Sequence, residues 1–254
     1  MDLRKFMPTV KKQADKFYII HYSSEGLFDD GTNGLSTRIT SIVVMHYATR
    51  QIVSFSLHTE AESLAVPREK MELSYDDIER SLLKRFYDFA RDRREEYWIH
   101  WNMRSVTFGF EHLEHRYRVL HGAEPPLIPV EVRINLNDAL KVRYGDGYAK
   151  DPKLPNLMRM NSGMSPSYLS GAEEAEAFKQ KQFIRMNNST ISKVMFLQYV
   201  VDQSIAGRLR TTVTGLLVAI DRALESRYAR TTAFTGTLIG ICTALYKFGT
   251  WAVG

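Results

Sequence analysis

The segment from Phe17 to Leu27, FYIIHYSSEGL, constrains the fold more than any other part of the 254-residue sequence. It begins with aromatic and β-branched residues, carries no formal charge before Glu25, and passes through a glycine. Residues of the first kind favour extended structure, and glycine favours a turn. The pattern predicts a buried strand that ends in a glycine turn.

The segments that follow alternate between strand and helix patterns. Two strands are predicted in residues 37–58, joined at YATRQ. A helix is predicted from Ser74, because apolar residues recur at helical spacing and the first turn carries acidic residues. A short strand follows in residues 97–101, a helix in residues 109–120, and a further extended run near residues 125–140. This order predicts an α/β fold whose sheet begins with antiparallel strands.

The second half of the chain is predicted to be less regular at first. Residues 144–192 are rich in loop formers, with short helical pieces such as GAEEAEAFKQK. The segment STISKVMFLQYVVDQSIAGRL, residues 189–209, is predicted to be a helix, because Val194, Leu197, Val201 and Ile205 fall on one face.

Composition excludes several classes of protein. Hydrophobic residues make up 44% and charged residues 25%, which is typical of a folded domain and not of a disordered chain. The net charge of +5 favours an anionic partner such as nucleic acid or a lipid surface. The single cysteine, Cys242, excludes an intrachain disulfide and a cysteine-based zinc site, and it indicates a reducing compartment. No secretory signal is expected at the start, because no apolar stretch follows its basic residues.

Three segments together resemble the DEDD 3′–5′ exonuclease superfamily, which has a ribonuclease H-like fold. In that family the first strand ends in Asp-x-Glu before a glycine turn. IIHYSSEGL has the same setting, with His21 and Ser23 at the two acidic positions. A second family motif has an asparagine, a short gap and an aspartate. IHWNMRSVTFGFEHLEHRY matches it with Asn102, and Thr107 stands at the place of the aspartate. A third motif has a ring residue and a final aspartate on a late helix, and in MNNSTISKV these places hold Asn188 and Ser192.

The resemblance implies a ribonuclease H-like mixed sheet flanked by helices, but without the chemistry of the family. That chemistry uses two divalent ions about 4 Å apart, and it needs clustered carboxylates to hold them. All four acidic positions are replaced here, so we expect no catalytic residue and no metal ion.

Displaced acids could restore a metal site, and the candidates are Glu25, Asp29, Asp30, Asp138 and Asp146. The alternative interpretation is that these residues form turns and helix caps. His112 and His115 have helical spacing but no acidic motif beside them, so we expect them at the surface or at an interface.

Signatures of other site types are absent from the sequence. It contains no GxxxxGKS or GxxxxGKT, no GxGxxG and no GxSxG pattern. We therefore expect no cofactor. A groove that has lost its acids can still bind a nucleotide or a strand end, with Arg104 for phosphate and Trp101 for stacking on a base. Trp98 is predicted to lie in the core, and Trp101 is predicted either to line the groove or to be buried.

The last residues have a different pattern. Residues 209–230 are predicted to form an amphipathic helical stalk with a heptad-like seam, after a domain that covers residues 1–208. Residues 231–254 are apolar and have Lys247 as their only charge. About 20 helical residues cross a hydrocarbon core of about 30 Å. Arginines precede the segment, so the N-terminal domain is expected on the cytoplasmic side.

The apolar segment also carries a stripe of small and polar residues that could bring helices together in lipid. Its members are Gly236, Gly240, Thr243 and Lys247. The segment is predicted to be either an inner-membrane anchor or an assembly helix of a soluble cytoplasmic oligomer.

The sequence therefore predicts an inactive, nuclease-like sensor or scaffold. It would bind a nucleotide, nucleic acid or partner protein and form a homo-oligomer through its C-terminal helix. A bacterial protein with this architecture could act on the membrane, as anti-phage defence effectors do. The alternatives are a divergent metal-dependent nuclease that uses rearranged acids, and a soluble subunit of a larger complex.

Overall fold

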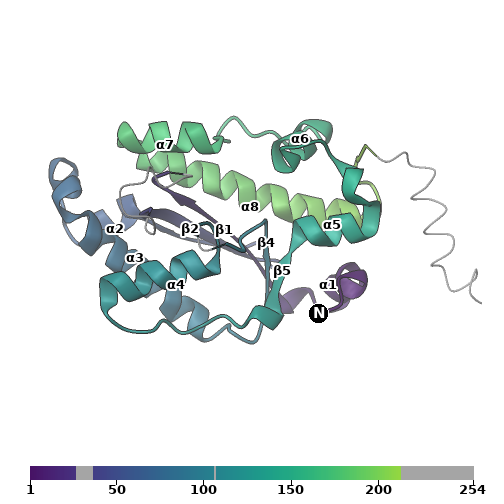
Figure 1. Ribbon diagram of the computed structural model, residues 1–254, viewed down its shortest axis with the longest axis horizontal. Coiled ribbons are helices and arrows are strands. Elements are labelled where there is room, and N and C mark those ends of the chain that lie inside the picture. The colour runs from purple at the N-terminus through teal and green to yellow at the C-terminus, as the bar shows by residue number, and fades with distance from the viewer. Residues whose placement is uncertain (27–36, 106, 213–254) are drawn as a thin grey trace, which may run out of the picture. The chain divides into compact units, whose positions relative to one another are not determined.

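The computed structural model describes residues 1–26, 37–105 and 107–212 (Figure 1). The chain divides into the units Met1–Arg210 and Thr211–Gly254, and the described helices and strands belong to the first. The described strands are β1 (Phe17–Ser24), β2 (Ile39–His46), β3 (Ile52–Ser56), β4 (Tyr97–His100) and β5 (Arg133–Asn135). The described α-helices are α1 (Phe6–Lys12), α2 (Leu57–Ser63), α3 (Tyr75–Arg91), α4 (Phe110–His121), α5 (Leu136–Tyr144), α6 (Lys153–Met160), α7 (Gly171–Lys179) and α8 (Phe183–Ala206). Short 3-10 helices cover Leu3–Lys5, Ala14–Lys16, Arg68–Ser74, Val130–Val132 and Asp146–Tyr148.

The five strands form one mixed sheet in the order β3-β2-β1-β4-β5. Strand β2 is antiparallel to β1 and β3, whereas β4 is parallel to both β1 and β5. The predicted α/β class and the antiparallel start of the sheet are confirmed. Ser74 is also the residue that precedes α3, as predicted. Its side chain makes no capping hydrogen bond, and Asp76 and Asp77 supply the negative charge that the first turn of a helix favours.

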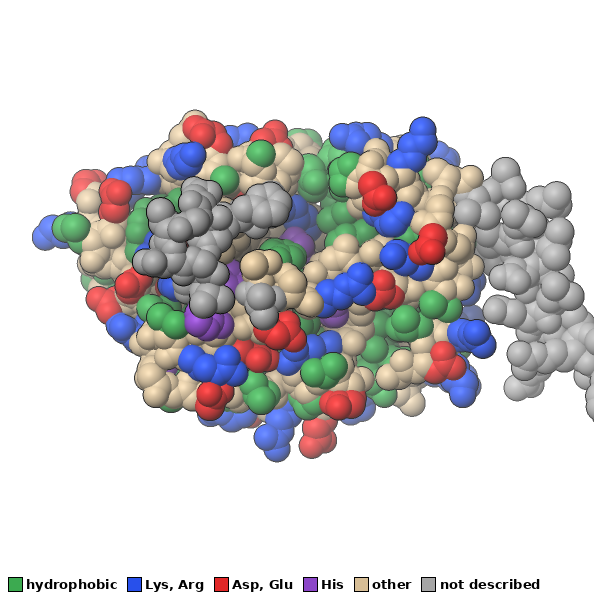
Figure 2. Space-filling model, viewed as in Figure 1, with side chains coloured by type: hydrophobic (Ala, Val, Ile, Leu, Met, Phe, Trp, Pro, Cys, Tyr) green, Lys and Arg blue, Asp and Glu red, His purple; other side chains and the backbone are tan. Residues whose placement is uncertain are grey.

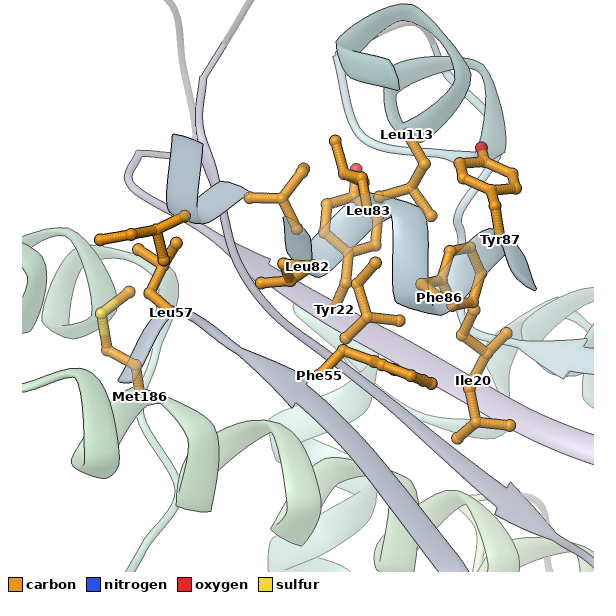
Figure 3. Close-up of a cluster of buried hydrophobic side chains, with 14 of the residues drawn as sticks. Ile20, Tyr22, Phe55, Leu57, Leu82, Leu83, Phe86, Tyr87, Leu113 and Met186 are labelled. Atoms are coloured by element: carbon orange, nitrogen blue, oxygen red, sulfur yellow. The ribbon is translucent and has the colours of Figure 1, made fainter. Parts of the chain in front are cut away.

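Strand β1 is at the centre of the sheet and is covered on both faces. On one face, Ile20 and Tyr22 pack with apolar side chains of α3 and α4, as Figure 3 shows. On the other face, the side chain of Ser23 contacts Thr190 of α8. Figure 1 shows α8 along one side of the sheet, with α3 and α4 on the other side. Because both faces are covered, seven of the eight residues of β1 are buried.

A buried ion pair connects α3 and α4 to the start of β2. The Glu79 carboxylate is fully buried and accepts hydrogen bonds from the Arg116 guanidinium and from the backbone N–H of Ile39, at 2.8 Å and 2.9 Å. Removing one partner of a buried pair leaves the other charge uncompensated, so such pairs fix the elements that carry them. This pair holds α3 and α4 on one face of the sheet.

The late helix, α8, begins earlier in the chain than the sequence predicts. Helix α8 begins at Phe183, whereas the predicted helix begins at Ser189. Phe183 and Met186 belong to the apolar cluster of Figure 3, and their burial extends the helix through a segment that the sequence analysis assigned to loops. Tertiary packing here outweighs local preference.

The predicted helical stalk does not begin at Leu209, which corrects the start of the predicted 209–230 element. Helix α8 ends at Ala206 and is followed by Gly207, whose left-handed conformation (φ 67°) commonly terminates helices. The Asn161 side chain then donates to the Arg210 carbonyl at 2.9 Å and accepts from the Arg210 N–H at 3.0 Å. These two bonds hold Arg210 in a non-helical conformation against the end of α6.

Most of the predicted tail lies outside the described residues. This applies to residues 213–230 of the stalk and to the predicted apolar helix, residues 231–254, with Gly236, Gly240, Thr243 and Lys247. In the part of the chain that the structure describes, no helix is both long and apolar enough to cross a bilayer. The membrane anchor therefore stays a prediction.

Candidate functional site

The carboxyl ends of β1, β4 and β5 meet at one edge of the sheet, because these three strands are parallel. In α/β sheets, ligands bind beyond the carboxyl ends of the strands, at the point where the strand order reverses. Here β2 lies on one side of β1 and β4 on the other. We define the strand-end site by the polar residues gathered at this edge: His21, Ser23, His100, Asn102, Arg104, Asn135, Asn137, Asp138, Glu174 and Lys193. Figure 2 shows histidine side chains near the middle of one face, close to basic side chains.

Ser23 connects three elements through its hydroxyl group. Its Oγ donates to Glu174 Oε1 at 3.0 Å and lies 2.6 Å from Thr190 Oγ1. Thr190 Oγ1 in turn lies 2.8 Å from the Ser41 hydroxyl of β2. The three hydroxyl groups belong to buried residues, so this network joins β1 and β2 to α7 and α8 without water-exposed groups.

The Glu174 carboxylate is neutralised by a buried lysine. Lys193 Nζ lies 2.6 Å from Glu174 Oε1, and Ser189 also donates to this oxygen at 2.9 Å. Ser189 and Lys193 are four residues apart on α8 and therefore share a face. Relative exposure is 7% for Glu174 and 6% for Lys193. The ammonium group thus occupies the position beside the carboxylate that a bound metal ion would take.

His21 is buried in the same region but is less well satisfied. Its Nδ1 has no hydrogen-bond partner among the described residues, and its ring packs edge-on against Phe108. Burial lowers the pKa of His21 well below its ordinary value of 6.5, and the neighbouring Lys193 and His100 lower it further. At neutral pH the ring is uncharged, and its buried Nδ1 is left without a hydrogen-bond partner among the described residues.

A second carboxylate at this edge is paired with an arginine. Asp138 accepts hydrogen bonds from Arg104 Nη1 and from Asn135 Nδ2. The Asn102 side-chain oxygen accepts from Asn135 and Asn137 at 3.2 Å and 3.0 Å. Asn102 adopts a left-handed conformation (φ 52°), which asparagine tolerates better than most residues. The edge therefore presents amides and balanced ion pairs.

The structure brings some of the predicted residues together and separates others. His21, Ser23, Asn102 and Arg104 all belong to the strand-end site. Thr107 does not contact it and is exposed, with its hydroxyl group 3.1 Å from Ser105 Oγ.

The predicted third motif is corrected by the helical phase of α8. Asn188 is exposed and lines a different pocket, and Ser192 Oγ donates to the Ser189 carbonyl. Consecutive residues of a helix point about 100° apart. The α8 residues that face β1 are Ser189, Thr190 and Lys193, which the sequence analysis missed together with Glu174. Their sequence signal is a lysine placed four residues after a serine, next to the apolar run VMFL of the same helix.

The remaining predicted residues have separate outcomes. Trp98 is fully buried, as predicted, and Trp101 is 6% exposed, so its indole cannot stack on a base in this conformation. The prediction that His112 lies at the surface is wrong, because it is 1% exposed and its Nδ1 lies 3.0 Å from the Tyr22 hydroxyl.

The displaced acids also form ion pairs where the structure describes them. Glu25 pairs with Arg38 at 2.8 Å, and exposed Asp146 lies 3.7 Å from Lys141. Asp29 and Asp30 lie outside the described residues. Within residues 1–26, 37–105 and 107–212, no group of three or more histidine, cysteine or acidic side chains could hold a metal ion.

Comparison with known proteins adds no relative. No family model, curated protein or solved structure matches this chain.

The Lys193–Glu174 pair can be tested by a double-mutant cycle. Lys193→Met and Glu174→Gln are each expected to lower the free energy of unfolding by about 3–5 kcal/mol, because each leaves a buried group without its charged partner. The double variant should lose less than the sum of the two single losses. Urea unfolding of the four proteins measures the coupling, and additive losses would show that the two groups do not interact.

His100 should make stability depend on pH. Burial lowers its pKa to about 3, with further lowering by Arg133 and Arg104. Since an unfolded histidine binds a proton below about pH 6.5 and this one does so only near pH 3, acid favours the unfolded state within that window. Each such group contributes a slope of about 1.4 kcal/mol per pH unit. His100→Gln should flatten the measured dependence between pH 6 and pH 4 by up to this amount, and an unchanged slope would contradict the assignment.

Proposed function

We propose that residues 1–210 form a non-catalytic recognition domain with a ribonuclease H-like fold, which binds a nucleotide or the end of a nucleic-acid strand at the strand-end site. The strand order β3-β2-β1-β4-β5, with β2 as the antiparallel member, supports the proposed fold. The late helix α8 lies against β1, as the resemblance to DEDD exonucleases implies.

One observation carries the proposed loss of catalysis. Of the acids at the strand-end site, Glu174 is paired with Lys193 and Asp138 with Arg104. A two-metal site needs several carboxylates whose charge is free to neutralise the ions. Here each negative charge is already balanced by a basic side chain of the protein itself.

The same residues support recognition. Amide groups and imidazole rings both donate and accept hydrogen bonds, which suits the edges of nucleobases. Because the ion pairs leave no excess negative charge, a phosphate group meets no electrostatic repulsion there. The unpartnered Nδ1 of His21 is the group that a ligand would satisfy.

Binding is tested with labelled single-stranded DNA and RNA by fluorescence anisotropy, and with mononucleotides by calorimetry, in the presence of EDTA. We expect binding without divalent ions. His21→Ala should raise Kd about tenfold or more, which corresponds to about 1.4 kcal/mol of binding free energy. The matched control is His46→Ala, since His46 pairs with Tyr18 near the opposite end of β1.

Two outcomes would overturn the proposal. Failure of every nucleotide and oligonucleotide to bind would reject the ligand class. Cleavage with magnesium or manganese that is lost in Asp29→Asn or Asp138→Asn would instead establish the divergent nuclease.

We further propose that residues 231–254 attach this domain to the inner membrane, where it forms a homo-oligomer. The motivation is the apolar sequence with a single lysine. The full-length protein should sediment with membranes and resist extraction by carbonate, and Leu238→Arg should release it. Extraction by buffer alone would favour the soluble complex.

A further inference from the structure

A pocket lies on a part of the domain separate from the strand-end site. It has a volume of about 560 Å³, within the range of pockets that hold small molecules. Helix α2, the 3-10 helix Arg68–Ser74, residues 166–167 and the start of α8 form its walls. It shares no residue with the strand-end site, so any ligand it holds is bound independently.

The pocket has an apolar wall that belongs to the core of the domain. Ala61, Met71 and Phe183 line it, and all three also belong to the buried apolar cluster. Their positions are fixed by packing with α3 and the sheet. The pocket is therefore preformed on this side, and its wall suits the apolar body of a ligand.

Basic side chains from two separate segments also line the pocket. They are Arg68, Lys181 and Arg185, whereas Glu62 is the single acid in the lining given by the described residues. Lys181 bonds Glu72 at 2.7 Å, and Arg185 donates to the Gln182 amide oxygen at 2.9 Å. In the described part of the chain neither Arg68 nor Arg185 forms an ion pair, so the lining has an excess of positive charge.

The start of α8 adds to this charge. The helix has 24 residues, and its first turn has neither a side-chain cap nor an acidic residue. The N-terminus of a helix carries a partial positive charge and unpaired N–H groups, and proteins usually place acids there. This helix has Lys181 and Arg185 at that place instead. An anion would relieve the repulsion and accept bonds from these groups.

We propose that this pocket binds a small organic phosphate, with the phosphate at Lys181, Arg185 and the start of α8, and an apolar body against Met71 and Phe183. A phosphate monoester carries about two negative charges at neutral pH, which matches the excess of basic side chains. Arginine contacts phosphate through paired N–H groups, and these bonds are strengthened by charge.

The test uses naphthyl phosphate as the probe and naphthol as its uncharged counterpart, with calorimetry on the full-length protein. Naphthyl phosphate is expected to bind at least about tenfold more tightly than naphthol. Arg185→Gln should weaken its binding about tenfold. Arg91→Gln is the matched control, since Arg91 is an exposed arginine paired with Asp88 at 2.9 Å outside the pocket lining, and it should leave Kd unchanged.

Two further variants make the assignment specific. Glu72→Gln should tighten binding, because it frees Lys181 from its present partner. His21→Ala should leave binding unchanged, which keeps the result separate from that of the strand-end site. Arg185 is exposed, so Arg185→Gln should leave the midpoint of urea unfolding unchanged, which excludes unfolding as the cause of weaker binding.

Four results would overturn the inference. They are equal affinity for naphthol and naphthyl phosphate, equal affinity for inorganic phosphate and naphthyl phosphate, unchanged binding in Arg185→Gln, and loss of binding in His21→Ala. The second would mean an adventitious ion only, and the fourth would place the probe at the strand-end site.

Discussion

The burial of β1 on both faces determines how the rest of the domain is arranged. A central strand satisfies its backbone through its neighbours, but every polar side chain on it needs a partner from a covering helix. Tyr22 packs its ring against α3 and α4, and its hydroxyl group accepts from the Gly109 N–H and lies 3.0 Å from His112 Nδ1. Ser23 meets it through Thr190 and Glu174, which requires α7 and α8 to approach the end of the strand. The buried Nδ1 of His21 has no such partner among the described residues, and this is why the strand-end site is a candidate for binding.

The charge balance at that edge is the reason for proposing ligand recognition there instead of phosphodiester cleavage. A buried carboxylate must be paired, and either a metal ion or a basic side chain can pair it. At this site the partner is a lysine or arginine of the chain itself. In the proposed recognition site, the internal ammonium group takes the place that a metal ion would have beside Glu174, so binding is expected not to depend on divalent ions. The proposed phosphate pocket differs, since Arg68 and Arg185 are exposed and form no ion pair within the described residues.

The sequence predicts the strands and helices that depend on local residue patterns. It does not predict the residues whose positions depend on contacts with distant parts of the chain. The strands β1 to β4 and the helix α3 follow from alternation and helical spacing, and their order gives the α/β class. Glu174 could not be predicted, because AEEAEAF has several acids and nothing local distinguishes the one that is buried. Asn188 and Ser192 were placed in the site, whereas a shift of one residue along α8 brings Ser189, Thr190 and Lys193 to β1. Asn135 and Asn137 were missed because β5 has only three residues and gives almost no periodic pattern.

The Ser23 hydroxyl group joins residues that are 151 and 167 positions away in the sequence. During synthesis at about 5–20 residues per second, the end of β1 therefore waits on the order of ten to thirty seconds for its partners. Chaperones can bind the first strand during that interval. A polypeptide interrupted before α8 lacks Thr190 and Lys193, so Ser23 and Glu174 keep their final partners only once the whole domain has been made.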